Sequence, residues 1–268
     1  MKVIRYQKAG SPPQYGSLND DGTACALAGS IESGFTPTAQ TVSGFDLLPP
    51  AEPPAIYCIG ANYRHHIEEC GGMKVPERPL VFMKGINALQ AHGKPIRIPR
   101  VCSATEVDYE CELAVVIGKA CKNATRASAL DHVFGYTCAN DVSARDWQLN
   151  LGGGQWCRGK GFDTFLPLGP VLVTADEIPD PNELRLGTIL NGQTVQDWNT
   201  NDMVFDVAAI IEFLSQDTTL LPGTVIITGT PHGVGMARKP ALWLKPGDTV
   251  EVEIEKIGRL TNPVQAAN

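Results

Sequence analysis

The amino-acid sequence predicts a β-rich α+β fold, and not a doubly wound parallel sheet. Apolar segments are short, turn-forming residues separate them, and 27 glycines and 20 prolines are spread along the 268 residues. Such a pattern is typical of many short strands joined by turns, and it disfavours helical bundles. A chain of this length suits one large domain, or one large domain with a small appendage.

The first 50 residues predict a small β-rich domain. MKVIRYQ, at 1–7, has the pattern of a strand. Asn19-Asp20-Asp21-Gly22 is a hairpin turn signal, and TACALAG follows it as the partner strand. Four prolines within 47–54 exclude a helix or a central strand, so this segment is expected to be a linker. We therefore expect a domain over 1–50 and a second domain over 51–268.

The second domain is expected to contain most of the strands. Asn191-Gly192 marks a hairpin within one of them. The segments with strand patterns are AIYCIGA (55–61), PLVFMKG (79–85), YECELAVVIGK (109–119), YTCANDVSARD (136–146, strand into loop), FLPLGPVLVT (165–174), LRLGTILNGQTVQ (184–196) and VEVEIEKIGRL (250–260).

Three segments predict helices. NYRHHIEECGG, at 62–72, has the pattern of a short helix stopped by its two glycines, and RASALDHVFG, at 126–135, is expected to form another. DVAAIIEFLSQ is amphipathic, with Val207, Ile210, Ile211 and Leu214 on one face.

Charge and hydropathy exclude several classes of partner. The net charge of −7 argues against nucleic acid and anionic membranes, which need a basic surface. No apolar stretch approaches the roughly 18 residues that a membrane helix requires. The N-terminus lacks the apolar region of a secretory signal, which predicts a cytoplasmic protein, or a mitochondrial one if a transit segment has been removed. None of the eight cysteines forms a CxxC pair, so reduced, buried thiols are expected.

Two carboxylates at alternating positions are the first candidate for chemistry. In a strand, Glu110 and Glu112 would point to the same face, and hard divalent cations prefer such oxygen ligands. A solvated polar face is the alternative, and we assign that role to Glu251, Glu253 and Glu255 in VEVEIEK. Glu110 and Glu112 differ because the apolar run LAVVIG follows them directly. Carboxylates at the mouth of a buried strand need a metal ion or charged partners.

Three further groups carry possible chemistry, each with an ordinary alternative. Asp141 follows an apolar stretch and could be a ligand or a turn-forming residue. His66 and Glu69 are spaced i and i+3 on the predicted helix, as in a carboxylate-supported general base, or as in a simple surface pair; His65 is the competing imidazole. Lys160, between two glycines, could meet an anionic oxygen or be an ordinary surface lysine. No P-loop, GxGxxG or GxSxG motif is present.

Seven segments in this order resemble the fumarylacetoacetate hydrolase superfamily. They cover roughly 55–260, and the part from RDWQ to NTNDMVF is most similar to the fumarylacetoacetate-hydrolase-domain-containing proteins. The segments are CIGANYRHHIEE, PLVFMKG, EVDYECELAVVIGK, GYTCANDVSARDWQ, GKGFDTFLPLGP, NGQTVQDWNTNDMVF and PGTVIITGTPHGVG.

The resemblance implies the mixed β-sandwich roll of that family and usually a homodimer. It implies Mg²⁺ or Mn²⁺, with Ca²⁺ as a further candidate, on Glu110, Glu112 and Asp141. It makes His66 and Glu69 the catalytic base pair, on a segment that orders over the substrate. It also implies that Lys160, Gln148 and Thr230 contact the substrate or a developing oxyanion.

Two positions depart from the family pattern. Relatives often have an acidic residue where this chain has His65, so the resemblance implies that a carboxylate near the metal is missing. Gly85 stands where relatives often have proline.

The implied activity is metal-dependent hydrolysis of a C–C bond in a β-diketo acid such as an acylpyruvate. The expected partners are this small dicarbonyl acid and a second copy of the chain. Lys160 would stabilise the oxyanion that forms when activated water attacks. The same enolate-stabilising site serves decarboxylation or tautomerisation of oxaloacetate, and isomerisation of a 2-hydroxy-diene-dioate. A catalytically idle metal-binding scaffold is the remaining alternative, and the complete set of candidate residues argues against it.

Overall fold

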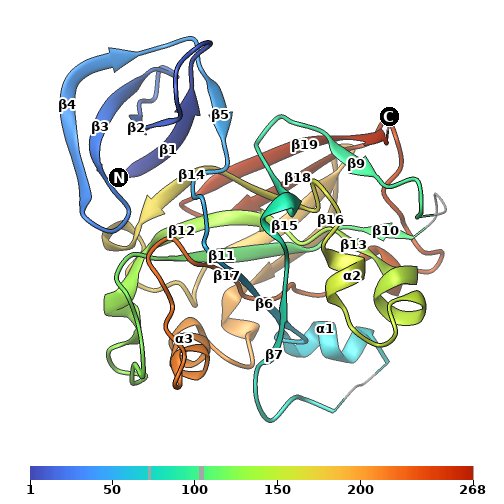
Figure 1. Ribbon diagram of the computed structural model, residues 1–268. Coiled ribbons are helices and arrows are strands. Elements are labelled where there is room, and N and C mark those ends of the chain that lie inside the picture. The colour runs from blue at the N-terminus through green and yellow to red at the C-terminus, as the bar shows by residue number, and fades with distance from the viewer. Residues whose placement is uncertain (72–73, 103–105, 268) are drawn as a thin grey trace.

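The computed structural model describes residues 1–71, 74–102 and 106–267 and is dominated by β-structure (Figure 1). Its largest sheet has 12 strands, in the order β4-β3-β2-β1-β14-β12-β11-β17-β6-β7, with β5 paired to β1 and β8 paired to β14. The strands are Lys2–Gln7 (β1), Gln14–Leu18 (β2), Ala24–Ser30 (β3), Gly34–Val42 (β4), Asp46–Leu48 (β5), Ile56–Gly60 (β6), Leu80–Met83 (β7), Leu89–Gln90 (β8), Cys111–Ile117 (β11), Val133–Asn140 (β12), Leu166–Thr174 (β14) and Val225–Ile227 (β17).

Two smaller sheets complete the β-structure, and short helices lie between the strands. The five-stranded sheet has the order β16-β15-β18-β19-β9, and β10 pairs with β13. Their bounds are Ile96–Ile98 (β9), Val107–Asp108 (β10), Ser143–Ala144 (β13), Arg185–Leu190 (β15), Gln193–Asn199 (β16), Thr249–Ile254 (β18) and Gly258–Ala266 (β19). The α-helices are Arg64–Glu69 (α1), Cys157–Lys160 (α2) and Val207–Ser215 (α3); a π-helical turn spans Trp147–Leu151, and 3₁₀ turns span Ile86–Ala88, Ala129–His132, Ala175–Glu177, Thr200–Asp202 and Gly235–Ala237.

Strand β11 lies in the middle of the hydrophobic core, with all seven residues buried. Side chains alternate between the faces of a strand. Leu113 and Val115 therefore pack in one apolar cluster and Ala114 and Val116 in the other. Both faces of the strand are covered, which explains why its sequence is a continuous apolar run rather than an alternating one.

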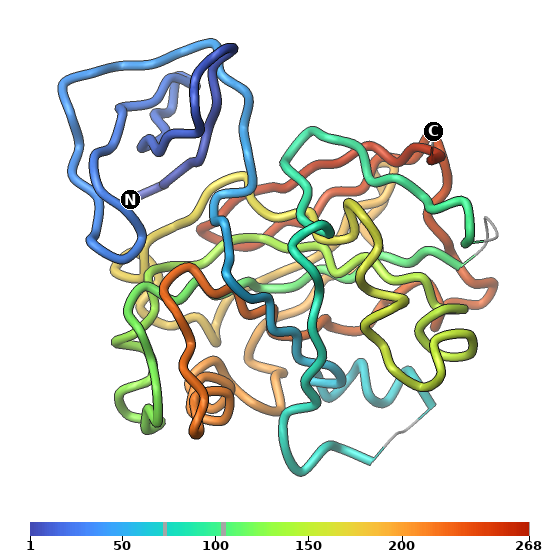
Figure 2. Tube along the Cα trace, in the orientation of Figure 1, coloured from blue at the N-terminus to red at the C-terminus, as the bar shows by residue number. Residues whose placement is uncertain are grey.

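The N-terminal strands β1–β5 form the blue lobe that Figure 2 traces at the N-terminal end. TACALAG is β3, as predicted, but its hairpin partner is β2, a strand that the sequence did not reveal. Strand β1 pairs with β2, β5 and β14, so hydrogen bonds continue from this lobe into the rest of the large sheet. The predicted linker begins inside β5, while a domain boundary at residue 50 stays a prediction.

Two of the three predicted helices are confirmed, and one was wrong. The buried side chains of α3 include Val207, Ile210, Ile211 and Leu214, the face that periodicity predicts. Helix α1 ends at Glu69, and Gly72, which was expected to help stop it, lies outside the described residues.

The segment 126–135 forms only a 3₁₀ turn and then enters β12. Its end is β-favouring, since Val133 and Phe134 are β-branched and aromatic. Gly135 lies so close to the neighbouring strand that a Cβ would be 2.2 Å from the Val173 carbonyl oxygen. Sheet pairing therefore overrides the weak helical pattern.

The β-rich class and its mixed sheets are as predicted. The Asn191-Gly192 hairpin joins β15 to β16, with φ of 51° and 79° at the two turn residues, as a type I′ turn requires. All eight cysteines are free. In the part of the chain that the structure describes, no helix is long and apolar enough to span a membrane.

Candidate metal and active site

A cavity of about 250 Å³ collects most of the candidate residues. Its walls come from the end of β6, from α1, β7 and α2, from the π-helical turn, and from the segments beside β11, β12 and β17. The lining residues are Ile59, Gly60, Ala61, His66, Cys70, Phe82, Glu110, Glu112, Asp141, Arg145, Gln148, Leu149, Trp156, Lys160, Thr230 and Met236.

Glu110, Glu112 and Asp141 meet on one side of this cavity. Ligand oxygens of the three carboxylates all lie within 4.8 Å of one another, and the residues are 4%, 2% and 0% exposed. Strand alternation places the two glutamates together, as predicted. Asp141 joins them because β11 and β12 pair, and its amide donates a hydrogen bond of 2.9 Å to the Glu110 carbonyl.

Three buried cations surround the carboxylates. Lys160 Nζ donates to Glu110 Oε2 and Asp141 Oδ2, both at 2.7 Å. An Arg145 nitrogen lies 2.6 Å from Glu110 Oε1, and Lys84 Nζ lies 2.7 Å from Asp141 Oδ1. Burial alone would raise the pKa of Glu110, but Lys160, Arg145 and His66 outweigh it and lower that pKa to about 2.

Glu112 has a different environment from its neighbour. Its Oε2 accepts a 2.6 Å hydrogen bond from the Gly229 amide. No basic side chain of the described residues forms an ion pair with it. Burial raises the pKa of Glu112 well above its usual range, and the charges of Asp141 and Glu110 add to this effect.

These carboxylates fit a hard divalent cation. Within the described residues, the buried Asp141 Oδ1 has Lys84 Nζ at 2.7 Å as its one charged partner, which leaves a lone pair for a metal ion. All three groups offer oxygen, the ligand that Mg²⁺, Mn²⁺ and Ca²⁺ prefer. A cation here would also remove the electrostatic cost of an ionised Glu112.

His66 and Glu69 form the predicted pair on α1. The distance from His66 Nδ1 to Glu69 Oε1 is 2.8 Å, and the other oxygen, Oε2, accepts a 2.8 Å hydrogen bond from the Gly233 amide. Burial lowers the pKa of His66, but contacts with Cys70 and Glu69 and the charge of Glu110 outweigh it and raise that pKa to about 9. The helical spacing thus places a carboxylate-supported imidazole in the cavity wall.

Gln148 and Thr230 also line the cavity, each held by a buried polar partner. Gln148 Oε1 accepts a 2.9 Å hydrogen bond from Arg145. Thr230 Oγ1 accepts one of 2.9 Å from Gln196 Nε2, and the side-chain oxygen Oε1 of Gln196 accepts from the Thr188 hydroxyl at 2.7 Å. The structure therefore brings all eight predicted site residues into one region, although Glu69 stands behind His66 rather than in the lining.

His65 faces away from this cavity. Its Nδ1 lies 3.0 Å from Asp202 Oδ1, and its ring packs against Trp198 at a centroid distance of 4.6 Å. It is absent from the cavity lining. The expectation that this departure removes a carboxylate from the metal's surroundings was therefore wrong, because position 65 contacts the Asp202 turn instead.

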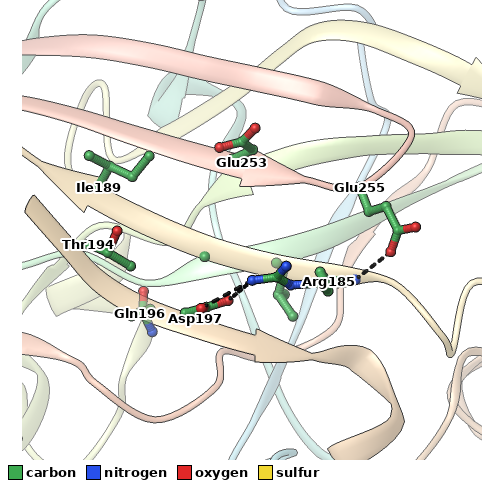
Figure 3. A pocket seen from close by; sticks show the side chains of 9 residues that line it. Arg185, Ile189, Thr194, Gln196, Asp197, Glu253 and Glu255 are labelled. Atoms are coloured by element: carbon green, nitrogen blue, oxygen red, sulfur yellow. Dashed lines mark hydrogen bonds and ion pairs between the residues drawn. The ribbon is translucent and has the colours of Figure 1, made fainter. Parts of the chain in front are cut away.

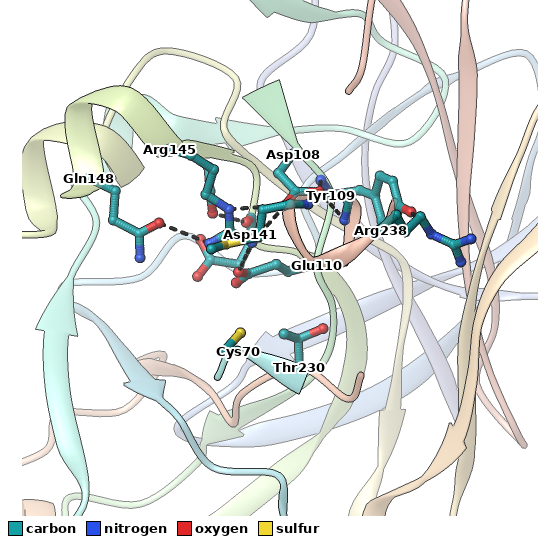
Figure 4. A network of polar contacts seen from close by, with 12 residues as sticks. Cys70, Asp108, Tyr109, Glu110, Asp141, Arg145, Gln148, Thr230 and Arg238 are labelled. Carbon is teal, nitrogen blue, oxygen red and sulfur yellow. Dashed lines mark hydrogen bonds and ion pairs between the residues drawn. The ribbon is translucent and has the colours of Figure 1, made fainter. Parts of the chain in front are cut away.

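Lys84, Arg145 and Asp108 are charged site residues that the sequence did not single out. Figure 4 shows Arg145 beside Asp108, Glu110 and Gln148, with Cys70 and Thr230 on the other side of the cluster. Asp108 Oδ2 accepts from Arg145 at 2.8 and 3.0 Å. Lys84 Nζ donates to the carbonyls of Val142 at 3.0 Å, Phe165 at 2.8 Å and Lys160. The sequence could have indicated these three residues, because each lies within a segment that resembles the family: PLVFMKG, RDWQ and EVDYECEL.

A second, more open cavity of about 330 Å³ lies on the five-stranded sheet (Figure 3). Arg185 there forms an exposed ion pair with Asp197 at 3.0 Å, Glu253 lies on β18, and Glu255 lies in the turn that follows it. These charged side chains are largely in solvent. Among the described residues, the lining of this second cavity includes no buried charge and no imidazole, which distinguishes it from the first.

Comparison with known proteins agrees with the fold. Residues 55–265 match the family model described as the C-terminal domain of fumarylacetoacetate hydrolase. That match includes the carboxylate cluster and all the other residues that line the cavity. The chain belongs to the fumarylacetoacetate hydrolase family.

Within that family, several relatives share one description. The chain is similar to "Oxaloacetate tautomerase fahd2, mitochondrial" of Xenopus laevis, with 43% identity over 98% of this chain and 90% of the relative. It is 46% identical to "Oxaloacetate tautomerase FAHD2A, mitochondrial" of Homo sapiens, over 81% of this chain and 68% of the relative. The predicted resemblance to fumarylacetoacetate-hydrolase-domain-containing proteins is confirmed.

Two solved structures extend the comparison. The 2-hydroxyhepta-2,4-diene-1,7-dioate isomerase of Mycobacterium marinum superposes with a TM-score of 0.86 at 38% identity, covering 100% of this chain and 99% of that one. The fumarylacetoacetate hydrolase of Exiguobacterium antarcticum has a TM-score of 0.88 at 35% identity, with 100% of both chains covered. The predicted fold class is therefore confirmed, while the relatives' descriptions span three reactions.

Proposed function

We propose that this chain is a divalent-cation-dependent enzyme that interconverts the keto and enol forms of a small 2-keto dicarboxylic acid such as oxaloacetate. One observation carries the proposal: a single buried cavity holds both an all-oxygen carboxylate cluster and a carboxylate-supported imidazole. The descriptions of the Xenopus and human relatives support it. This reaction stood as the alternative to C–C hydrolysis in the sequence-based expectation.

The residues of the cavity supply binding and proton transfer. Lys160 and Arg145, both buried, attract the anionic oxygens of a dicarboxylate. Glu69 contacts Nδ1 of His66, so Nε2 is the ring atom that takes a proton from the carbon between the keto and carboxylate groups and delivers it to the keto oxygen, with the same transfer in reverse for ketonisation. Gln148 and Thr230 offer polar atoms that orient the substrate.

We propose that Glu110, Glu112 and Asp141 hold Mg²⁺ or Mn²⁺, with Ca²⁺ as a further candidate. When bound, such a cation supplies Lewis acidity to a substrate carbonyl oxygen. Its positive charge close to Glu110 would also lower the raised pKa of His66, because like charges disfavour the protonated imidazole. Glu69 and the Gly233 amide keep the imidazole oriented throughout.

Hydrolysis of a C–C bond in an acylpyruvate-like β-diketo acid is the second candidate. Lys160 contacts two carboxylates in the cavity that His66 also lines, so the cavity holds a cation of the kind that stabilisation of a second oxyanion would require. The solved structure from Exiguobacterium antarcticum, which has the same fold, is described as a fumarylacetoacetate hydrolase. Decarboxylation of oxaloacetate and a catalytically idle scaffold remain outcomes of the same assay.

The deciding experiment follows enol-oxaloacetate by ultraviolet absorbance, with Mg²⁺ and with chelator. We expect metal-dependent acceleration of enol loss with no carbon dioxide released. In parallel, an acylpyruvate is incubated in ¹⁸O-labelled water. Label in a released carboxylic acid, without acceleration of the oxaloacetate reaction, would replace tautomerisation by hydrolysis.

We also propose a homodimer in a reducing compartment. Edge strand β7 exposes Leu80 at 41% and Met83 at 43%, and Ile86 beyond it is 66% exposed, a surface that a second copy would cover. Eight free cysteines favour the cytosol or the mitochondrial matrix, and the two relatives above are described as mitochondrial. Light scattering and cell fractionation test these two proposals.

A further inference from the structure

A second group of metal-ligating side chains lies on α1 and just beyond its end. His66, Glu69 and Cys70 are spaced i, i+3 and i+4, so they share one face of the helical turn. One donor atom from each lies within 4.8 Å of the others. Cys70 Sγ is 3.8 Å from His66 Nδ1 and 3.9 Å from Nε2, and Nδ1 is 2.8 Å from Glu69 Oε1.

The donors of this group differ in kind from those of the carboxylate cluster. Imidazole nitrogen and thiolate sulfur are ligands for Zn²⁺ and similar borderline or soft cations, whereas Mg²⁺ and Mn²⁺ prefer oxygen. Glu110, Glu112 and Asp141 offer oxygen alone. Two metal-competent groups of different softness therefore border the same cavity, which both His66 and Cys70 line.

We propose that His66, Glu69 and Cys70 form a second cation site, selective for Zn²⁺, which inhibits the enzyme when occupied. The ion takes Nδ1 of His66, Oε1 of Glu69 and Sγ of Cys70, and its fourth position stays open to water. The thiol proton and any proton on Nδ1 leave to solvent, and bonds to the ion replace the hydrogen bond between His66 and Glu69.

The surroundings already hold two of the ligands in place. The Gly233 amide fixes Oε2 of Glu69 at 2.8 Å, which leaves Oε1 directed at the imidazole. The side chains of His66 and Glu69 are 13% and 20% exposed, and His66 and Cys70 line the cavity, so an ion can reach the group. Cys70 is free and half-buried. Little rearrangement is needed to convert the observed contacts into ligand bonds.

Inhibition follows from the identity of the ligands. An imidazole nitrogen bound to Zn²⁺ and separated from its carboxylate no longer acts as a carboxylate-supported base. This consequence rests on the proposed catalytic role of His66, but the binding of Zn²⁺ does not. We therefore expect Zn²⁺ to inhibit at saturating Mg²⁺, and excess Mg²⁺ to leave the inhibition in place.

Co²⁺ provides a direct spectroscopic test, because it occupies zinc sites and shows thiolate charge-transfer absorption in the near ultraviolet. The full chain is saturated with Mg²⁺ and titrated with Co²⁺ alone. We expect that absorption in the unchanged chain and in Cys25→Ala, a control that removes another half-buried, free cysteine. We expect none in Cys70→Ala. Calorimetry should show Zn²⁺ affinity reduced by about tenfold or more in Cys70→Ala.

The outcomes separate this proposal from the proposed function. Charge-transfer absorption that persists in Cys70→Ala, or that vanishes equally in Cys25→Ala, would overturn the second site. So would Zn²⁺ binding that disappears in Glu112→Ala but not in Cys70→Ala, because the ion would then occupy the carboxylate cluster. An inactive enzyme that still shows Cys70-dependent Co²⁺ absorption would refute the proposed function and leave the site standing.

Discussion

Two strands of this molecule carry glutamates at alternating positions, and they lie in opposite environments. Glu110 and Glu112 at β11 are 4% and 2% exposed, and Glu110 pairs with the buried cations Arg145 and Lys160. On β18, the Glu253 side chain is 51% exposed and pairs with Arg259 at 2.8 Å, while Glu251 accepts from the Thr261 hydroxyl. The same spacing therefore gives a site on one strand and a solvated face on the other, and burial is what separates them.

The largest expected effect comes from removing one carboxylate at each location. Glu112→Ala should remove most Mg²⁺ or Mn²⁺ affinity and lower turnover by about 10³-fold or more, because the Lewis acid is lost. Glu253→Ala should change neither quantity. Calorimetric titration with Mg²⁺ measures the affinities. Normal Mg²⁺ binding by Glu112→Ala would show that the glutamates at β11 are no more metal ligands than those on β18.

The next effect concerns the imidazoles beside the buried carboxylates. His66→Ala should lower turnover on the order of 10²–10⁴-fold, as expected for loss of a general base. His65→Ala is the matched control and should cost far less, since its side chain faces Asp202 outside the cavity. Steady-state kinetics on the preferred substrate decide between them. Equal losses of turnover in the two variants would show that a position in the cavity does not determine which histidine acts as the general base.

A smaller effect compares the cations that pair with each set of glutamates. Lys160→Ala removes a hydrogen-bonded cation from the buried Glu110 and Asp141, and should lower the free energy of unfolding of the metal-free protein by about 3–5 kcal/mol. Arg259→Ala removes exposed pairs on β18 and should cost about 1 kcal/mol or less. Denaturant unfolding measures both changes. A similar loss in the free energy of unfolding for the two variants would contradict the larger contribution expected of the buried pairs.

The smallest expected effect is that of metal removal on stability. A cation that binds only the folded protein stabilises it by about 2.7 kcal/mol when present at 100 times its dissociation constant. Chelator should therefore lower the melting temperature of the unchanged chain and of Glu253→Ala. The melting temperature of Glu112→Ala should not respond. A response to chelator in all three proteins would place the stabilising ion elsewhere.

The sequence predicted the fold class and the central carboxylates because both depend on local pattern. The apolar run after Glu112 indicated a buried strand, and strand alternation placed Glu110 beside it. Strands β2 and β4 escaped prediction because they are polar or largely exposed, as in QYGSL and GFTPTAQTV. Such segments lack the apolar alternation from which a strand is recognised.

The partners of the carboxylates could not be predicted in the same way. Asp108 and Arg145 are 37 positions apart, and Lys84 contacts a carboxylate 57 positions later in the chain. Only the pairing of β11 with β12 and the packing of β7 bring such residues together. The segment 126–135 illustrates the opposite error, since a helical pattern yielded there to sheet pairing with β14.

The buried Lys84 has a consequence that follows from counting hydrogens. An ammonium group carries three N–H bonds, and Lys84 directs three donations to the carbonyls of Val142, Lys160 and Phe165. Asp141 Oδ1 lies 2.7 Å from the same Nζ, as an ion-pair partner of a group whose three N–H bonds are directed at carbonyls. The lysine thus compensates the charge of this carboxylate while leaving the lone pairs of that oxygen available. Arginine has five donors in a flat, rigid fork. It could not compensate the charge of the carboxylate in this way while leaving the lone pairs of the oxygen available.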